Sequence, residues 1–125
     1  MLHALKTKRV YLPAEADDGF RALVDRLWPR GLSKEKAALD LWNKEVAPSA
    51  ALRTWFAHDP ARFAKFRADY LTELAGNSAA AAFAELCRER LEEGDVTLLF
   101  GAKDTNRNQA VVLKEWLLSE LGADR

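Results

Sequence analysis

The chain is poor in the residues that build metal centres, disulfide frameworks and membrane spans. It contains one cysteine, Cys87, and only two histidines, His3 and His58. One cysteine cannot form an internal disulfide, and these numbers exclude a zinc site built from several His and Cys ligands. No apolar run approaches the roughly 20 residues of a membrane-spanning helix, and residues 1–6 lack the apolar core of a signal peptide. We therefore expect a cytoplasmic protein with no metal site and no membrane partner.

The chain also lacks an excess of charge of either sign. Lys plus Arg and Asp plus Glu both number 19, so the formal net charge is zero. A protein that coats nucleic acid non-specifically needs a broad basic surface, and this balance argues against one. Hydrophobic residues make up 49% and charged residues 30%, which is typical of a folded globular chain. At 125 residues, we expect a single domain over residues 1–125.

Short apolar segments predict three strands, at residues 9–12, 21–27 and 96–100. The last is a continuous apolar run, as expected for a strand that is covered on both faces. The link between the first two strands is shorter than the dozen or so residues that a parallel crossover usually needs, so a hairpin is an open alternative there.

The remaining segments have helical patterns. Ser33 and Ser49 are each expected to cap a short helix, and Asp59 is expected to cap a longer helix that ends at Gly76, because Pro60 follows it. Two longer helices are expected at residues 78–93 and from about residue 108 to residue 121. Helices on both sides of a buried strand predict a small layered α/β domain, with helices flanking a mainly parallel sheet of three to four strands.

The clearest functional signal lies in residues 23–31, which read Leu-Val-Asp-Arg-Leu-Trp-Pro-Arg-Gly. The segment begins as a buried strand and then admits three charged side chains. Ligands of open α/β sheets bind beyond the carboxyl ends of the strands. A second polar segment, residues 101–108, follows the last strand and precedes a helix. Residues 25–36 carry four basic and two acidic side chains, so this end of the sheet is locally positive.

The first hypothesis is that this end of the sheet binds a small ligand with a phosphate or carboxylate group. Arginine forks hold such groups by two-point hydrogen bonding, and a helix N-terminus adds free N–H groups. Asp25 would position an arginine. The competing interpretation is an Asp25–Arg ion pair that only fixes the loop. The expected ligand-binding residues are Arg26, Trp28, Arg30, Lys34, Lys103 and Asn108.

Two alternatives place other functions at the same segment. The first is a hydrolase or transferase in which Asp25 or His58 acts as acid or base, although His58 could equally make a structural hydrogen bond at a helix end. The second is a nucleic-acid accessory protein in which Trp28 stacks on a base. The chain has no phosphate-binding glycine motif and no serine-hydrolase elbow, and Cys87 lies on an apolar helix face. The sequence specifies no cofactor and no oligomeric state.

Residues 24–31 belong to a longer pattern that resembles a known family. Together with residues 38–42 and 44–49, they are similar to the YeaO-like group of bacterial proteins, which belongs to the family called domain of unknown function 488. The similarity continues from residue 9 to residue 117. It implies a compact Rossmann-like cytoplasmic domain, and it implies no activity, because none is assigned to the family. The pattern of the family points to Asp25, Arg26, Pro29, Arg30, Gly31, Lys44 and Asn108.

The chain departs from this pattern at Gln109. The resemblance implies that relatives commonly have Asn-His-Ala at the start of the last helix, where this chain has Asn108-Gln109-Ala110. Glutamine donates and accepts hydrogen bonds but does not carry protons. The departure therefore favours binding over histidine-dependent catalysis.

Overall fold

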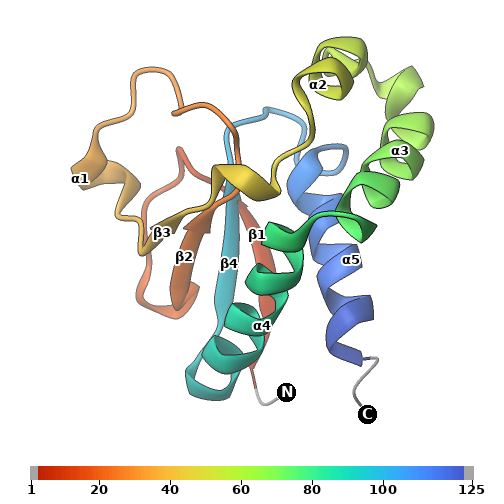
Figure 1. The fold of residues 1–125 in the computed structure, drawn as a ribbon. Coiled ribbons are helices and arrows are strands. Elements are labelled where there is room, and N and C mark those ends of the chain that lie inside the picture. Colours follow the sequence, from red (N-terminus) through yellow and green to blue (C-terminus); the bar gives the residue numbers. More distant parts are fainter. Residues whose placement is uncertain (1–2, 123–125) are drawn as a thin grey trace.

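The computed structural model describes residues 3–122, and its centre is a four-stranded parallel sheet (Figure 1). The strands are β1 (Leu5–Arg9), β2 (Phe20–Leu23), β3 (Leu41–Trp42) and β4 (Val96–Phe100), in the spatial order β1-β4-β2-β3. All residues of β4 are buried, because this strand lies between β1 and β2 and is covered on both faces. The predicted strand at residues 96–100 and the parallel α/β architecture are confirmed.

The hairpin alternative for the first two strands is wrong. β1 and β2 both run parallel to β4, which separates them. Residues 10–19 return the chain to the start of β2 with a single 3-10 turn, η1 (Ala16–Asp18). An extended chain advances about 3.3 Å per residue, so this link is long enough to run back along strands of four or five residues. The crossover needs no helix because the strands are so short.

The predicted bounds of these two strands were also wrong. The first strand is Leu5–Arg9 rather than residues 9–12, and its single apolar residue hides it from a hydrophobic pattern. It is an edge strand whose lysines reach out to neighbouring turns: Lys6 donates to the Asp17 carbonyl and Lys8 to the Pro13 carbonyl. The second strand ends at Leu23, four residues before its predicted end.

Most of the other predicted elements are present. The helices are α1 (Lys34–Ala37), α2 (Ala50–Phe56), α3 (Phe63–Ala75), α4 (Ser78–Glu93) and α5 (Gln109–Gly122), with 3-10 turns η2 (Lys44–Val46) and η3 (Pro60–Arg62). The three predicted caps are confirmed: Ser33 accepts from the Lys36 N–H, Ser49 from the Leu52 N–H and Asp59 from the Ala61 N–H. Among residues 3–122, no helix combines the length and apolarity that crossing a membrane requires.

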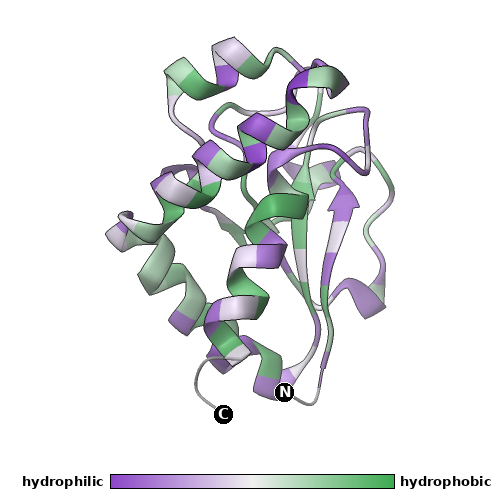
Figure 2. Ribbon diagram, turned by 90° about the vertical axis from the view of Figure 1, so that its right-hand side faces the viewer, coloured by the Kyte–Doolittle hydropathy of each residue, from purple (hydrophilic) through white to green (hydrophobic). Residues whose placement is uncertain are grey.

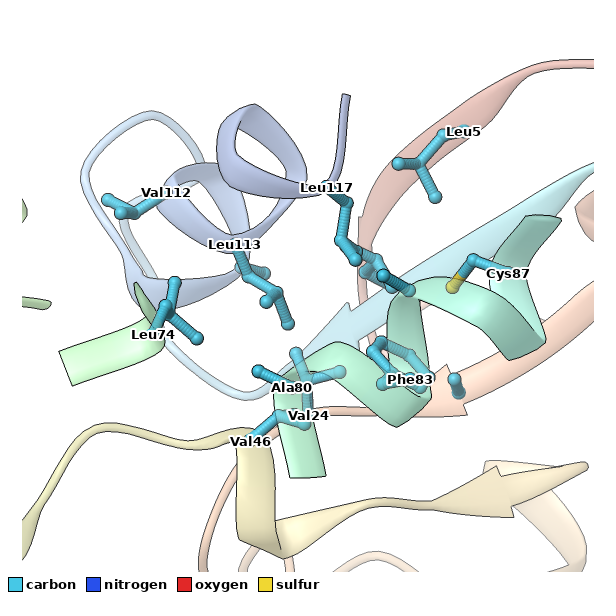
Figure 3. Close-up of a cluster of buried hydrophobic side chains, with 14 of the residues drawn as sticks. Leu5, Val24, Val46, Leu74, Ala80, Phe83, Cys87, Val112, Leu113 and Leu117 are labelled. Atoms are coloured by element: carbon cyan, nitrogen blue, oxygen red, sulfur yellow. The ribbon is translucent and has the colours of Figure 1, made fainter. Parts of the chain in front are cut away.

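Alternation along the strands divides the core into two parts. Ala22, Leu98 and Phe100 belong to a large cluster with apolar side chains of α2 to α5, part of which is shown in Figure 3. Leu23 and Leu99 belong to a smaller cluster that includes Ala37 of α1. Successive side chains of a strand point to opposite faces, so the long helices cover one face of the sheet and α1 with its flanking loops covers the other (Figure 1). Figure 2 shows how apolar and polar positions alternate along the covering helices.

Charged side chains near the amino end of β2 form ion pairs and hydrogen bonds with one another. The buried Asp18 carboxylate accepts hydrogen bonds from Arg21 and Lys8, and Arg21 also donates to the carbonyls of Ala37 and Ala38. Burial alone would raise the pKa of Asp18, but the Glu15 N–H and the two cations outweigh it and hold that pKa below its usual range. These ion pairs and hydrogen bonds have a structural role. The carboxyl end of the sheet holds its charged groups in a different arrangement.

Candidate functional site

The strand register brings Asp25 and Gly101 together at the carboxyl end of the sheet. β2 pairs with β4 so that Leu23 lies opposite Leu99, and each chain runs two residues further to reach this pair. The Gly101 N–H donates to Asp25 Oδ2 over 2.8 Å. A Cβ atom at residue 101 would lie only 3.1 Å from this oxygen, so the close approach favours glycine. The two polar segments that the sequence singles out therefore do meet.

Two further hydrogen bonds fix Asp25. The side-chain amide of Gln109, the first residue of α5, donates to Asp25 Oδ1, and the Trp42 indole N–H donates to the Asp25 carbonyl over 2.8 Å. Burial raises the pKa of Asp25 to about 6, even though the Gly101 N–H, the Gln109 amide and the nearby His58 and Arg53 act to lower it. Its carboxylate therefore titrates near neutral pH and forms no ion pair with an arginine among the described residues. The Asp25–Arg ion pair that the sequence raised as an alternative is not formed.

A pocket of about 310 Å³ opens beside Asp25, between the carboxyl end of the sheet and α2. This cavity, the α2 pocket, has apolar walls formed by Leu27, Ala47, Pro48, Phe56 and Phe66. Its polar lining consists of Asp25, Arg53, Thr54, His58 and Gln109. Mostly apolar walls with a few convergent polar groups are typical of small-molecule sites.

Helix α2 is anchored so that Arg53 faces the pocket. At its start, the Ser49 N–H and hydroxyl donate to the two carboxylate oxygens of Glu73 on α3, over 2.9 and 2.7 Å. Near its end, the Phe56 ring stacks on Phe66 with centroids 4.2 Å apart. The Arg53 Nε donates to the Pro48 carbonyl over 3.3 Å, which directs the guanidinium along the pocket wall. No carboxylate lies within ion-pair distance of Arg53 among residues 3–122, and Arg53 lines the pocket.

His58 reaches the pocket from a strained turn. Ala57 and His58 both adopt positive φ angles, 47° and 58°, directly after α2. Such angles are unfavourable for residues with a Cβ atom, and they concentrate at functional sites. The His58 side chain is exposed, and its ring centroid lies 6.0 Å from that of Phe56. The turn therefore places an imidazole at the mouth of the cavity.

The loop before α5 is a rigid hydrogen-bonded unit. Asn108 is completely buried; its Oδ1 accepts from the Val111 N–H and its Nδ2 donates to the Asp104 carbonyl. Asp104 in turn accepts from the N–H groups of Asn106 and Arg107. The structure thus gives Asn108 a capping position in which both side-chain atoms bind protein groups.

The other expected ligand-binding residues lie outside the α2 pocket. Arg26 lies 4.0 Å from Glu45, and Arg30 is exposed, with its carbonyl accepting from the Tyr11 hydroxyl. Trp28 packs edge-on against Trp42 and donates its indole N–H to the Leu32 carbonyl. Lys34 is exposed on α1, and Lys103 is exposed in the loop that follows β4.

Of the residues expected to act, Asp25 and His58 line the pocket together. Sequence reasoning missed Arg53 as a site residue and treated Gln109 only as a departure from a family pattern. A signal for Arg53 was present, because it precedes the inward-facing Phe56 by three positions, and residues three apart share one face of a helix. Gln109 needed the fold, since its partner lies 84 residues away in the sequence.

Fold and pocket together define a small parallel α/β domain with a ligand-sized cavity built around a half-buried carboxylate at the carboxyl edge of its sheet. The chain belongs to the domain of unknown function 488 family: residues 4–125 match the family model described as "Inactive DUF488-N3 subclade". This match confirms the YeaO-like resemblance.

Relatives in two bacterial lineages cover almost the whole chain. The chain is 46% identical over 116 residues to "Uncharacterized protein YeaO" of Escherichia coli (strain K12), which covers 92% of the chain and 97% of that protein. It is 40% identical over 113 residues to "Uncharacterized protein Rv3073c" of Mycobacterium tuberculosis (strain ATCC 25618 / H37Rv), which covers 90% of the chain and 92% of that protein. No solved structure matches the chain.

Proposed function

We propose that the protein binds a small organic anion in the α2 pocket without transforming it. The observation that carries this proposal is the convergence of Arg53 and His58 on a cavity with apolar walls, with no carboxylate paired to Arg53 among the described residues. An arginine with free terminal N–H groups forms short, charge-assisted hydrogen bonds with a carboxylate or phosphate.

Asp25 and Gln109 supply the polar end of the site. Asp25 lies in the same pocket as Arg53, and both of its carboxylate oxygens already accept protein hydrogen bonds, from the Gly101 N–H and the Gln109 amide. Gln109 uses its N–H on Asp25, which leaves its carbonyl as an acceptor for a ligand hydroxyl or N–H group. The proposed ligand therefore carries an acidic group near Arg53 and a neutral hydrogen-bond donor near Gln109.

The family description supports binding rather than turnover. The model that matches the chain is described as inactive, and this chain has Gln109 where the resemblance implies histidine. A catalytic role for Asp25 is the second candidate, because a carboxyl group whose pKa is about 6 can both take and give a proton near neutral pH.

The test is thermal stabilisation by acetate, butyrate, benzoate and inorganic phosphate, followed by titration of whichever stabilises the protein. Arg53→Ala should weaken the affinity about 10- to 100-fold, the value of one or two charge-assisted hydrogen bonds. Arg30→Ala is the matched control, because it removes an arginine that lies outside the pocket. Equal loss in both variants, or no stabilisation of the wild type by any of these anions, would overturn the proposal.

Asp25→Asn separates the two candidates. For a binding site, the variant should keep or improve its anion affinity, because it loses a nearby negative charge. For an enzyme, turnover of a substrate by the wild type should vanish in the variant while binding persists.

A further inference from the structure

A second hollow of about 530 Å³ shares His58 with the α2 pocket. The lining of this second hollow includes Arg9, Tyr11, His58, Gly101, Lys103 and Asp104. Neither Arg9 nor Tyr11 lines the α2 pocket.

The lining of the second hollow carries two basic side chains, Arg9 and Lys103, and one acidic side chain, Asp104. The Arg9 Nε donates to the Ala102 carbonyl over 3.1 Å, and its guanidinium lies 4.6 Å from the centroid of the Tyr11 ring. Within residues 3–122, neither Arg9 nor Lys103 forms an ion pair. The one acidic residue of the lining, Asp104, accepts from two backbone N–H groups and pairs with Arg107 at 3.6 Å. Asp104 therefore has partners other than Arg9 and Lys103 among the described residues.

The junction between the two cavities is formed by His58 and Gly101. His58 lines both cavities, and Gly101 lines the second hollow while its N–H holds Asp25 of the first. A Cβ atom at residue 101 would lie 3.1 Å from the Asp25 carboxylate and 3.8 Å from the Tyr11 ring, which places it between the two cavities. Glycine therefore leaves room at residue 101 between the Asp25 carboxylate and the Tyr11 ring.

We propose that the two cavities form one elongated site for a molecule with an acidic group at each end and a neutral middle. This inference rests on the proposed function and extends it. Arg53 binds one acidic group in the α2 pocket, Arg9 and Lys103 bind the other in the second hollow, and the middle of the ligand passes His58 and Gly101. The apolar walls on either side of the junction, Phe56 and Phe66 in one cavity and Pro60 and Ala102 in the other, suit an uncharged chain.

Linear dicarboxylates provide the probe, in the series succinate, glutarate, adipate, pimelate and suberate. Each is compared with its own monomethyl ester, which has nearly the same length but only one charge. We expect the affinity to rise to a maximum at one chain length, and the diacid at that maximum to bind about five- to tenfold more tightly than its ester, as expected for a partly exposed ion pair.

Two variants test which residues bind the second acidic group of the ligand and whether the middle of the ligand passes Gly101. The double variant Arg9→Ala/Lys103→Ala should reduce the best diacid to the affinity of its ester and leave the affinity of the ester unchanged. Lys36→Ala, an exposed charge change on α1, should alter neither. Gly101→Ala should weaken binding of long diacids more than binding of butyrate, because its methyl group narrows the junction.

The outcomes distinguish this inference from the proposed function. If diacids and esters bind equally and the double variant changes nothing, while Arg53→Ala still weakens binding, the elongated site is refuted and the α2 pocket stands. If Arg53→Ala leaves butyrate binding unchanged, the proposed function itself is refuted, and the elongated site with it. If the double variant is less stable than wild type, its unchanged affinity for the ester shows that the pocket is still folded.

Discussion

The carboxylate of Asp25 accepts a hydrogen bond from the side-chain amide of Gln109, 84 residues later in the chain. This contact joins the segment after β2 to the first residue of α5, and both residues line the α2 pocket. Because Gln109 is uncharged, it stabilises the Asp25 carboxylate less than a cation would, and burial dominates the pKa of Asp25. Asp25 therefore has a pKa near neutral pH, whereas a cationic partner would have kept its carboxylate ionised.

The stability of the protein should therefore depend on pH through Asp25. Its pKa is raised from 3.8 to about 6 in the folded chain, so the folded state binds this proton more tightly than the unfolded state does. The linked stability is complete below about pH 4 and is lost as the pH rises through 6.

Asp25→Asn should remove this dependence and raise the free energy of unfolding at pH 8 by about 2 kcal/mol, since the side chain is partly accessible.

Chemical denaturation at several pH values measures this effect. Asparagine keeps an acceptor for the Gly101 N–H, and the Gln109 amide can rotate to present its carbonyl, so the variant should fold normally. Asp40→Asn, an exposed position, is the control. A variant that is less stable than wild type at pH 8 would show that the charged form of Asp25 is favoured by its surroundings.

Gln109→His should lower the pKa of Asp25. An imidazolium at residue 109 would lie beside the carboxylate, and an opposite charge at that distance favours the ionised form. The loss of stability linked to Asp25, which starts near its unfolded pKa of 3.8 in both proteins, should then be smaller and end at a lower pH than in the wild type. Carboxyl NMR titration of Asp25 gives the value directly, and an unchanged pKa would mean that residue 109 does not face Asp25 in solution.

Ser49→Ala should weaken both the fold and the pocket. It removes the cap of α2 and one of the two hydrogen bonds to Glu73, at a cost of about 1–2 kcal/mol in the free energy of unfolding. Because Arg53 lies on α2, anion affinity should fall as well. Ser33→Ala is the matched control: it uncaps α1, far from the pocket, and should lower stability without changing affinity. Equal affinities in the two variants would argue that α2 does not position Arg53.

Ala57→Gly should stabilise the protein by about 0.5–1 kcal/mol. Ala57 has a φ of 47°, which glycine adopts without the steric penalty of a Cβ atom, and this gain exceeds the extra entropy of an unfolded glycine. Ala51→Gly, an exposed position within α2, should instead destabilise by about 1 kcal/mol. Thermal unfolding of both variants checks the sign at each position, and destabilisation by Ala57→Gly would contradict the strained turn.

Local patterns determine much of this fold, and the long-range contacts determine the site. The apolar run at residues 96–100 and the caps Ser33, Ser49 and Asp59 could be predicted because each depends on near neighbours. The strand Leu5–Arg9 could not, because its polar side chains bind turns that are formed only after folding.

The residues of the site show the same difference between local patterns and long-range contacts. Asp25 was predictable as a site residue because it interrupts the apolar segment that begins at Leu23, and ligands of open α/β sheets bind at the carboxyl ends of the strands. The charge-rich loop drew attention to Arg26 and Arg30, but charge density along a sequence does not reveal which side chains face a cavity. Arg53 entered the site only because the Glu73 contact and the Phe66 ring fix the orientation of α2.

The most direct test of the central claim is an NMR titration of ¹⁵N-labelled protein with succinate. The account predicts that the Arg53 side-chain N–H and the backbone N–H groups of Gly101 and His58 shift together along one binding curve, and that Arg53→Ala abolishes these shifts. Shifts confined to Arg26, Arg30 and Lys34 would place the anion in the loop that the sequence suggested and would contradict an anion site in the α2 pocket.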